Sequence, residues 1–141
     1  MTTCSFISLA ITEKNIHLAI ASDEDEYMGT VSLKNIEDGS AEFAITVRSA
    51  AMRKGYAWFG MEAIINKAFN ELGLTSVYWC VSRDNERAVR FYDKHNFHEV
   101  VDIPAKVLER SEGINNLKWY SVLNGDELNV RESVAGCKVI H

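Results

Sequence analysis

Apolar and polar residues alternate along the chain in two rhythms, one typical of strands and one typical of helices. Six β-rich runs of strand length lie at 17–22, 27–33, 41–47, 76–81, 97–103 and 116–123. Between the third and fourth runs, apolar residues recur at three- and four-residue steps from Gly55 to Leu72, which predicts a long helix ended by Gly73. A second helix is predicted from the capping pair Asp84–Asn85 to about His95.

The order of these elements (strands, helix, strand, helix, strands) predicts the fold class. It is an α/β (α+β) arrangement in which helices flank a mixed central sheet. Asp38–Gly39 marks a turn between the second and third strands. No repeat, linker or low-complexity stretch interrupts the pattern, so we expect residues 1–141 to form a single domain.

Composition limits the classes of protein to which the chain could belong. It has 141 residues, of which 47% are hydrophobic and 25% are charged, the mixture of a globular domain with its own core. This mixture excludes intrinsic disorder and a collagen-like fibre. The formal net charge of -5 argues against a nucleic-acid partner, because nucleic-acid-binding proteins concentrate Lys and Arg where they meet the phosphates.

Cysteine usage and hydropathy indicate a compartment. Cys4, Cys80 and Cys137 are widely spaced and form no CxxC pair, which fits reduced thiols better than a disulfide framework. The first residues lack the basic and apolar regions of a signal peptide. No apolar stretch is long enough to cross a bilayer, so we expect no membrane partner and a cytoplasmic protein.

A basic, glycine-containing loop joins the third strand to the long helix and is the first candidate site. It runs from Val47 to Ala57 and carries Arg53, Lys54 and Gly55 where the helix begins. The first turn of a helix leaves backbone N–H groups unpaired and carries about half a positive charge, so this loop is a plausible pyrophosphate cradle. The alternative is an ordinary basic surface turn. Neither the P-loop pattern nor the dinucleotide-binding GxGxxG pattern is present.

A second motif follows about thirty residues later, and the two together resemble the signature motifs of the GNAT superfamily of acetyl-CoA-dependent N-acetyltransferases. In that family a strand precedes Gln/Arg-x-x-Gly-x-Gly/Ala and a long helix, and Asn-x-x-Ala-hydrophobic-x-x-Tyr-x-x-x-Gly-Phe comes later. This chain has Met52-Arg53-Lys54-Gly55-Tyr56-Ala57, and then Asn85 through Tyr92 to Asn96-Phe97. The strand 41–45 is similar to branches that act on ribosomal proteins, polyamines and nucleotide-linked amino sugars. The resemblance covers about residues 16 to 124.

The resemblance implies a mostly antiparallel central sheet, acetyl-CoA as cosubstrate and no metal. It also assigns roles to residues by position. The backbone of the third strand would splay from its neighbour and bind the pantetheine arm, through Ile45, Thr46 and Val47. The amides of the loop and first helical turn would hold the pyrophosphate, through Arg53, Lys54, Gly55, Tyr56 and Ala57. Asn85 would orient CoA or a bound water; its alternative role is a helix cap.

The resemblance also implies direct attack of a neutral amine on the thioester. Tyr92 would be the general acid that reprotonates the departing CoA thiolate. Glu42 is the candidate base, acting through a water; its alternative role is a strand carboxylate paired with a nearby Lys or Arg. A base is needed because an alkylammonium has a reference pKa of about 10.4. A backbone N–H near Thr46 or Val47 would polarise the thioester carbonyl.

Three features depart from the family pattern. Met52 stands where the family has Gln or Arg, so we expect weaker pyrophosphate binding, with Arg53 or Lys54 compensating. Asn96 replaces the glycine that ends the helix in the left-handed region, where Asn is the next best residue. Family members carry about two helices before the strand that starts here near His17. The acceptor cleft is therefore open, or a second subunit of a homodimer completes it.

The predicted function is acetyl transfer from acetyl-CoA to a primary amine in a ternary complex. The expected acceptor is a small amine or a nucleotide-linked amino sugar, with a protein N-terminus or a polyamine as alternatives. A rival of another class is a non-catalytic CoA-binding or dimerising module. His95 and His98 have no evident third ligand, so no metal site is expected, and Cys80 is expected to be a core thiol. One of the adjacent Trp58 and Phe59 is expected to face outward.

Overall fold

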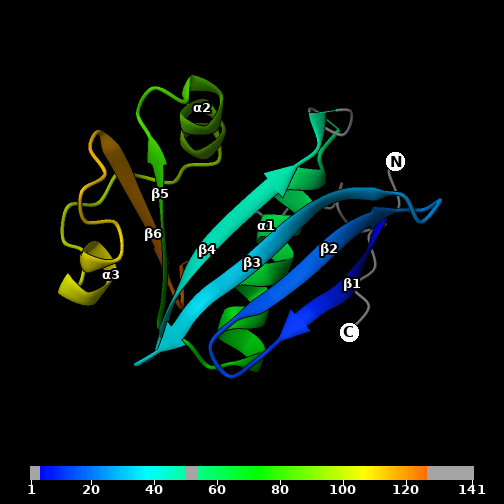
Figure 1. The fold of residues 1–141 in the computed structure, drawn as a ribbon, viewed down its shortest axis with the longest axis horizontal. Coiled ribbons are helices and arrows are strands. Elements are labelled where there is room, and N and C mark those ends of the chain that lie inside the picture. The colour runs from blue at the N-terminus through cyan, green and yellow to red at the C-terminus, as the bar shows by residue number, and fades with distance from the viewer. Residues whose placement is uncertain (1–3, 50–53, 127–141) are drawn as a thin grey trace.

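The computed structural model describes residues 4–49 and 54–126, with 4–10 described by their backbone alone. Its centre is a six-stranded sheet whose spatial order follows the chain (Figure 1). The strands are β1 (Cys4–Ile11), β2 (Ile16–Ser22), β3 (Tyr27–Glu37), β4 (Ser40–Val47), β5 (Ser76–Ser82) and β6 (Leu117–Leu123). The helices are α1 (Tyr56–Asn66), continued by a π-helical segment Lys67–Glu71, then α2 (Glu86–Lys94) and the short α3 (Ala105–Glu109).

The sheet is mostly antiparallel, as the resemblance implied. Strands β1 to β4 form an antiparallel meander, β4 and β5 are parallel, and β5 and β6 are antiparallel. The turn between β3 and β4 lies at Asp38–Gly39, where both residues have positive φ, 52° and 78°. The parallel pair requires a crossover, and α1 supplies it.

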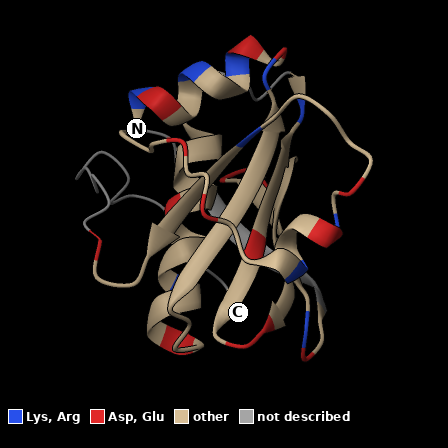
Figure 2. Ribbon diagram, turned by 90° about the vertical axis from the view of Figure 1, so that its left-hand side faces the viewer, with Lys and Arg blue, Asp and Glu red and all other residues tan. Residues whose placement is uncertain are grey.

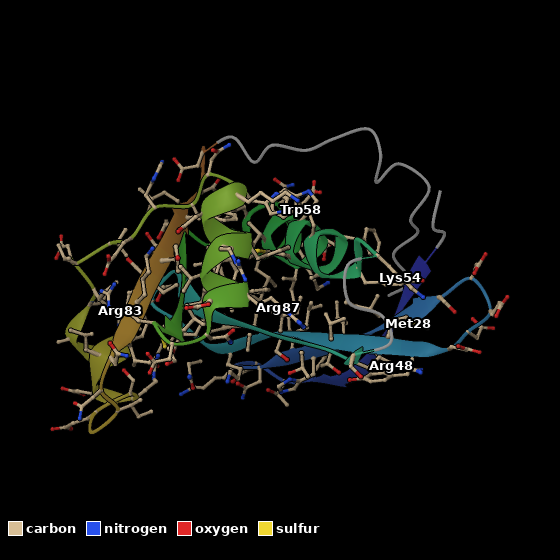
Figure 3. All side chains as sticks on the ribbon, turned by 90° about the horizontal axis from the view of Figure 1, so that it is seen from above. Met28, Arg48, Lys54, Trp58, Arg83 and Arg87 are labelled. Carbon is tan, nitrogen blue, oxygen red and sulfur yellow. The ribbon has the colours of Figure 1, made fainter. Side chains whose placement is uncertain are left out.

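Helix α1 packs closely on one face of the sheet and forms the main core. Met61, Ile64 and Ile65 of the helix are fully buried against this face. Gly60 permits the close approach, because a Cβ there would lie 2.7 Å from Ile20 Cδ1 and 2.8 Å from Val31 Cγ1. In Figure 3, α1 and α2 lie on the same side of the sheet. This packing fixes the start of α1 just beyond the end of β4.

The opposite face is different over each half of the sheet. Over β5 and β6 it carries a smaller cluster in which Ile103, Val107 and Trp119 pack with Tyr78 and Cys80. Over β3 and β4, the register pairs Thr30 with Thr46, Ser32 with Ala44, and Lys34 with Glu42. Small and polar side chains therefore line this part of the opposite face. Figure 2 shows many of the charged residues on the helices and in the loops rather than along the strands.

Two expectations about individual segments are wrong. Residues 97–103 form no strand and make one isolated bridge, Glu99 with Tyr120. Val101 is 91% exposed and Pro104 then begins α3, so the apolar run there is not held by a partner strand. Trp58 and Phe59 are both buried, because α2 covers the flank of α1 that carries Trp58, through Phe91.

The expected end of the second helix is confirmed. Asn96 has a φ of 66°, the left-handed conformation predicted for it, and the N–H of Phe97 donates to the carbonyl of Tyr92 at 3.1 Å. β1 was not predicted; it joins β2 through a turn at Thr12–Asn15. Within residues 4–49 and 54–126, no helix has the length and apolar character needed to span a membrane.

Candidate active site

Strands β4 and β5 separate part-way along their length. They pair at only three positions, of which Glu42 with Tyr78 is the last. Beyond Glu42, β4 continues to pair with β3 as far as Val47, opposite Gly29. The backbone of Phe43–Val47 therefore has its β3 partner but not its β5 partner, and its groups on the β5 side are placed to bind an extended ligand. The splay expected at Ile45, Thr46 and Val47 is present.

The N-terminus of α1 lies at the same end of β4. Gly55 precedes the helix with a φ of 86°, a conformation that strains any residue with a side chain. A Cβ added there would meet no atom of the described residues within 4 Å. The helix has no side-chain cap hydrogen bond to a described residue and no acidic residue in its own first turn, so its first turn supplies no carboxylate to offset the positive end. Tyr56 is buried and Ala57 is half-buried.

Basic side chains surround this end of the molecule. Figure 3 shows Arg48 and Lys54 where β4 ends and α1 begins, and Arg87 on α2. Arg48 and Lys54 are exposed, and Arg48 Nη1 donates to the carbonyl of Tyr27 at 3.1 Å. Met52 and Arg53 lie outside the residues that the structure describes, so the contacts expected of them stay predictions. The described elements fit an anionic group such as a pyrophosphate.

Tyr92 lies on the α2 side of the splay, packed among aromatic rings. Its ring centroid is 5.5 Å from that of Trp79, the β5 residue just after the last pair with β4, and 5.0 Å from that of Tyr120. Burial raises the pKa of the Tyr92 hydroxyl well above its usual value, and Tyr120 and Cys80 act in the same direction. The phenol therefore keeps its proton at neutral pH, as a general acid must.

Glu42 lies on the opposite face of the sheet, where β4 and β5 part. Its side chain is 17% exposed, and Oε2 accepts hydrogen bonds from Asn35 Nδ2, at 2.8 Å, and from Arg110 Nη1. The paired carboxylate that was the alternative role for Glu42 is thus present. Its role as the base stays a prediction. Nearby, burial raises the pKa of the Cys80 thiol; the charge of Glu42 adds to the rise, while that of Lys34 opposes it.

A comparison with known protein families agrees with the sequence motifs and with this geometry. The model of the acetyltransferase (GNAT) family matches residues 3–97, more than half of the chain. The chain belongs to the GNAT acetyltransferase family. No curated protein sequence matches it.

Solved structures of the same fold include spermidine N-acetyltransferases from Vibrio cholerae. A dodecameric structure in an intermediate state has a TM-score of 0.68 at 24% identity, over 83% of this chain and 69% of that one. A complex with CoA and spermine has a TM-score of 0.67 at 23% identity, over 80% and 68%. A SpeG point mutant has a TM-score of 0.67 at 24% identity, over 80% and 66%. These likenesses show the fold, and the GNAT chain spans about two thirds of those proteins' length.

Asn85 caps α2 in this GNAT domain. Its side-chain Oδ1 accepts a hydrogen bond from the Ala88 N–H at 3.2 Å, which is the helix-cap alternative for this residue. Its contact with CoA stays a prediction.

We expect Asn85→Ala to lower the free energy of unfolding by about 1 kcal/mol, because the Ala88 N–H loses its acceptor. Asn85→Asp retains an acceptor at this position and should unfold within a few tenths of a kcal/mol of the unmodified protein. Urea denaturation of the three proteins measures both effects. Equal losses in the two variants would contradict the capping role.

His95, one of the two histidines expected to bind no metal, packs against an aromatic ring. His95 stacks on Trp58, with ring centroids 3.9 Å apart and an interplanar angle of 4°. Among the residues whose positions are described, no group of three or more His, Cys, Asp or Glu is arranged to hold a metal ion.

Two polar residues with notable surroundings, one of them bonded to Glu42, escaped the sequence analysis. Arg110 is 68 residues from its partner Glu42, so no local pattern could reveal the pair. Glu62 lies in the long helix and is a carboxylate that is only 4% exposed. Burial raises the pKa of its carboxyl to about 7; the Trp58 indole opposes the rise, although Trp58 Nε1 and Glu62 Oε1 make no hydrogen bond to any described residue.

Proposed function

We propose that this GNAT protein transfers an acetyl group from acetyl-CoA to a primary amine. The observation that carries the proposal is the parting of β4 and β5 beyond Glu42, with the glycine-started N-terminus of α1 beside it. Acetyl-CoA needs these two features together: a strand edge with unused backbone groups for its extended arm, and a positive helix end for its pyrophosphate.

The described residues fit acetyl-CoA on three grounds. The backbone of Ile45–Val47 lacks a β5 partner, no described residue fills the space above Gly55, and the first turn of α1 carries no acidic side chain. When bound, acetyl-CoA supplies the thioester that the amine attacks. The Ile45–Val47 backbone would hold the pantetheine arm, and the start of α1 with Lys54 would hold the pyrophosphate.

Proton transfer falls to two residues on opposite faces of the sheet. Glu42 would take a proton from the acceptor amine, directly or through a water, because an amine attacks only in its neutral form. Both hydrogen bonds that Glu42 accepts end on Oε2, which leaves Oε1 for this proton. Tyr92 would donate its phenolic proton to the departing thiolate. A thiol has a reference pKa of about 8.5, so the thiolate is a good leaving group and needs only modest help from an acid.

We propose an aliphatic polyamine as the acceptor, in preference to a nucleotide-linked amino sugar. The solved structures of the same fold are named spermidine N-acetyltransferases, and one of them is a complex with CoA and spermine. The β3–β4 hairpin supports the same class of acceptor, because Glu42 lies where β4 and β5 part and Glu37 is close enough to share the Arg110 guanidinium with it, which places two carboxylates together there.

We also propose that a second subunit completes the acceptor side. A four-residue turn, Thr12–Asn15, joins β1 directly to β2, so no helix follows β1 to cover this side. One solved relative in fold is named as dodecameric, which supports assembly of some kind. The cysteine spacing supports a reducing, cytoplasmic location.

The test is acetyl-CoA-dependent thiol release from the purified protein with separate acceptors: spermidine, a nucleotide-linked amino sugar and a peptide with a free N-terminus. Mass spectrometry identifies the acetylated product. We expect release with spermidine that exceeds release with the other two. If acetyl-CoA binds and no amine is acetylated, the proposal fails and the protein is a CoA-binding module.

A further inference from the structure

The guanidinium of Arg110 binds the two carboxylates that lie nearest the acceptor side. Arg110, which directly follows α3, donates from Nη1 to Glu42 Oε2 and from Nη2 to Glu37 Oε1, the latter at 2.8 Å. Its side chain is 29% exposed, and the side chains of Glu37 and Glu42 are 33% and 17% exposed. One cation therefore bridges two carboxylates at a half-buried, solvent-reachable position.

The other carboxylate of the hairpin is also paired. Lys106 of α3 lies 3.1 Å from Asp38, and Lys14 lies 3.8 Å from Glu37. Each acidic side chain that the hairpin presents is thus matched by a lysine or arginine of the same chain. An incoming ammonium therefore finds a lysine or an arginine already beside each of these three carboxylates.

Exchange of one cation for another overcomes this obstacle, because replacing the guanidinium by an ammonium leaves the net charge unchanged. The backbone of α3 need not move, since Val107 and Ile103 anchor it against Trp119. Only the long Arg110 side chain has to swing away.

We propose that Arg110 occupies the acceptor's cation position, so that an acceptor binds by displacing it from Glu42 and Glu37. The inference rests on the proposed function, which makes the acceptor an amine that arrives as an ammonium. Because Arg110 bridges two carboxylates, an acceptor with two or more ammonium groups replaces both contacts, whereas a monoamine replaces one. Every acceptor has to break contacts of Arg110 before it binds, so Arg110 weakens the binding of any amine at this position.

The test compares Arg110→Gln with the unmodified protein and with Lys106→Gln, which removes the same charge from the same segment but leaves Glu42 and Glu37 bridged. Calorimetry measures the binding of spermidine and of butylamine to each protein saturated with CoA, so that no turnover is needed. Thermal midpoints confirm that each variant is folded.

In Arg110→Gln, we expect spermidine to bind about tenfold more tightly, because the competing charged hydrogen bonds are gone. The preference for spermidine over butylamine should not narrow, because Glu42 and Glu37 both remain to bind two ammonium groups. Lys106→Gln should bind spermidine within about twofold of the unmodified protein, as expected for an exposed pair.

Spermidine binding to Arg110→Gln that is equal to or weaker than binding to the unmodified protein overturns the inference, and so does an absence of spermidine binding to either. If Arg110→Gln does not fold, Arg110→Lys decides, because its single ammonium cannot bridge both carboxylates as the fork does; unchanged or weaker spermidine binding then overturns the inference. Failure of the proposed function looks different: spermidine binds as expected, yet no acetyl group is transferred to it.

Discussion

Replacement of Tyr92 by phenylalanine is expected to lower kcat for acetyl transfer by about 100-fold and to leave the Kd of acetyl-CoA within about twofold. General acids contribute factors of about 10² to 10⁴, and the lower end applies because a thiolate is a good leaving group. Phenylalanine retains the packing of Tyr92 against Trp79 and Tyr120, so the fold and the binding groups on β4 and α1 are undisturbed. Single-turnover kinetics with acetyl-CoA and spermidine separate chemistry from binding.

Tyr78→Phe is the matched control for this variant. Tyr78 is the β5 residue opposite Glu42, next to the splay, but it faces the smaller cluster with Ile103 and Val107 rather than the α2 side. The kcat of Tyr78→Phe should stay within about threefold of the kcat of the unmodified protein. A normal rate in Tyr92→Phe, or equal losses in both variants, would contradict the assignment of Tyr92 as the acid.

Glu62→Gln is expected to make the protein more stable above neutral pH. The ordinary carboxyl pKa of 4.5 applies to the unfolded chain, whereas burial raises the native pKa of Glu62 to about 7. Between these values the folded protein holds more protons than the unfolded chain. The free energy of unfolding therefore falls as pH rises from about 4.5, and the loss is complete above about pH 7.

The two pKa values correspond to a loss of about 3 to 4 kcal/mol at alkaline pH, since each pKa unit is worth about 1.4 kcal/mol. Glutamine mimics the protonated, neutral carboxyl. At pH 8 we therefore expect Glu62→Gln to unfold at a midpoint several degrees higher than the unmodified protein, and at pH 4.5 at nearly the same midpoint.

Glu112→Gln is the control, because Glu112 is exposed on the loop before β6. It should follow the unmodified protein at every pH. Thermal unfolding by circular dichroism from pH 4.5 to pH 8 checks the three proteins. If Glu62→Gln is no more stable than the unmodified protein at pH 8, the Glu62 carboxyl is not destabilised by burial.

The parts of the site that the sequence predicted are those formed by neighbouring residues. Gly55 starts α1 and Asn96 ends α2, each in a positive-φ conformation that few other residues adopt without strain. Asn85 caps α2 through a contact three residues away. The change from strand to helix periodicity after Val47 placed the crossover between β4 and β5. Such features depend on spacing, and spacing is visible in a sequence.

The missed parts depend on tertiary contacts. The apolar run at 97–103 has the composition of a strand, but it makes a single isolated bridge to β6, between Glu99 and Tyr120. Glu62 is polar and lies off the apolar stripe of its helix, and it is buried because α1 is covered on more than the side that faces the sheet. The bridge from Arg110 to Glu42 and Glu37 joins residues 68 and 73 positions apart. No rule of periodicity connects positions so distant.

The central claim is that acetyl-CoA binds along β4 where this strand parts from β5, with its pyrophosphate at the start of α1. Amide hydrogen–deuterium exchange with and without CoA tests it most directly, because it reports on the backbone groups that have no β5 partner. We predict slower exchange with CoA in peptides that cover Phe43–Val47 and the first turn of α1, and unchanged exchange in peptides from β2. Binding of CoA that leaves exchange in Phe43–Val47 unchanged, or an absence of binding at millimolar CoA, would contradict the account.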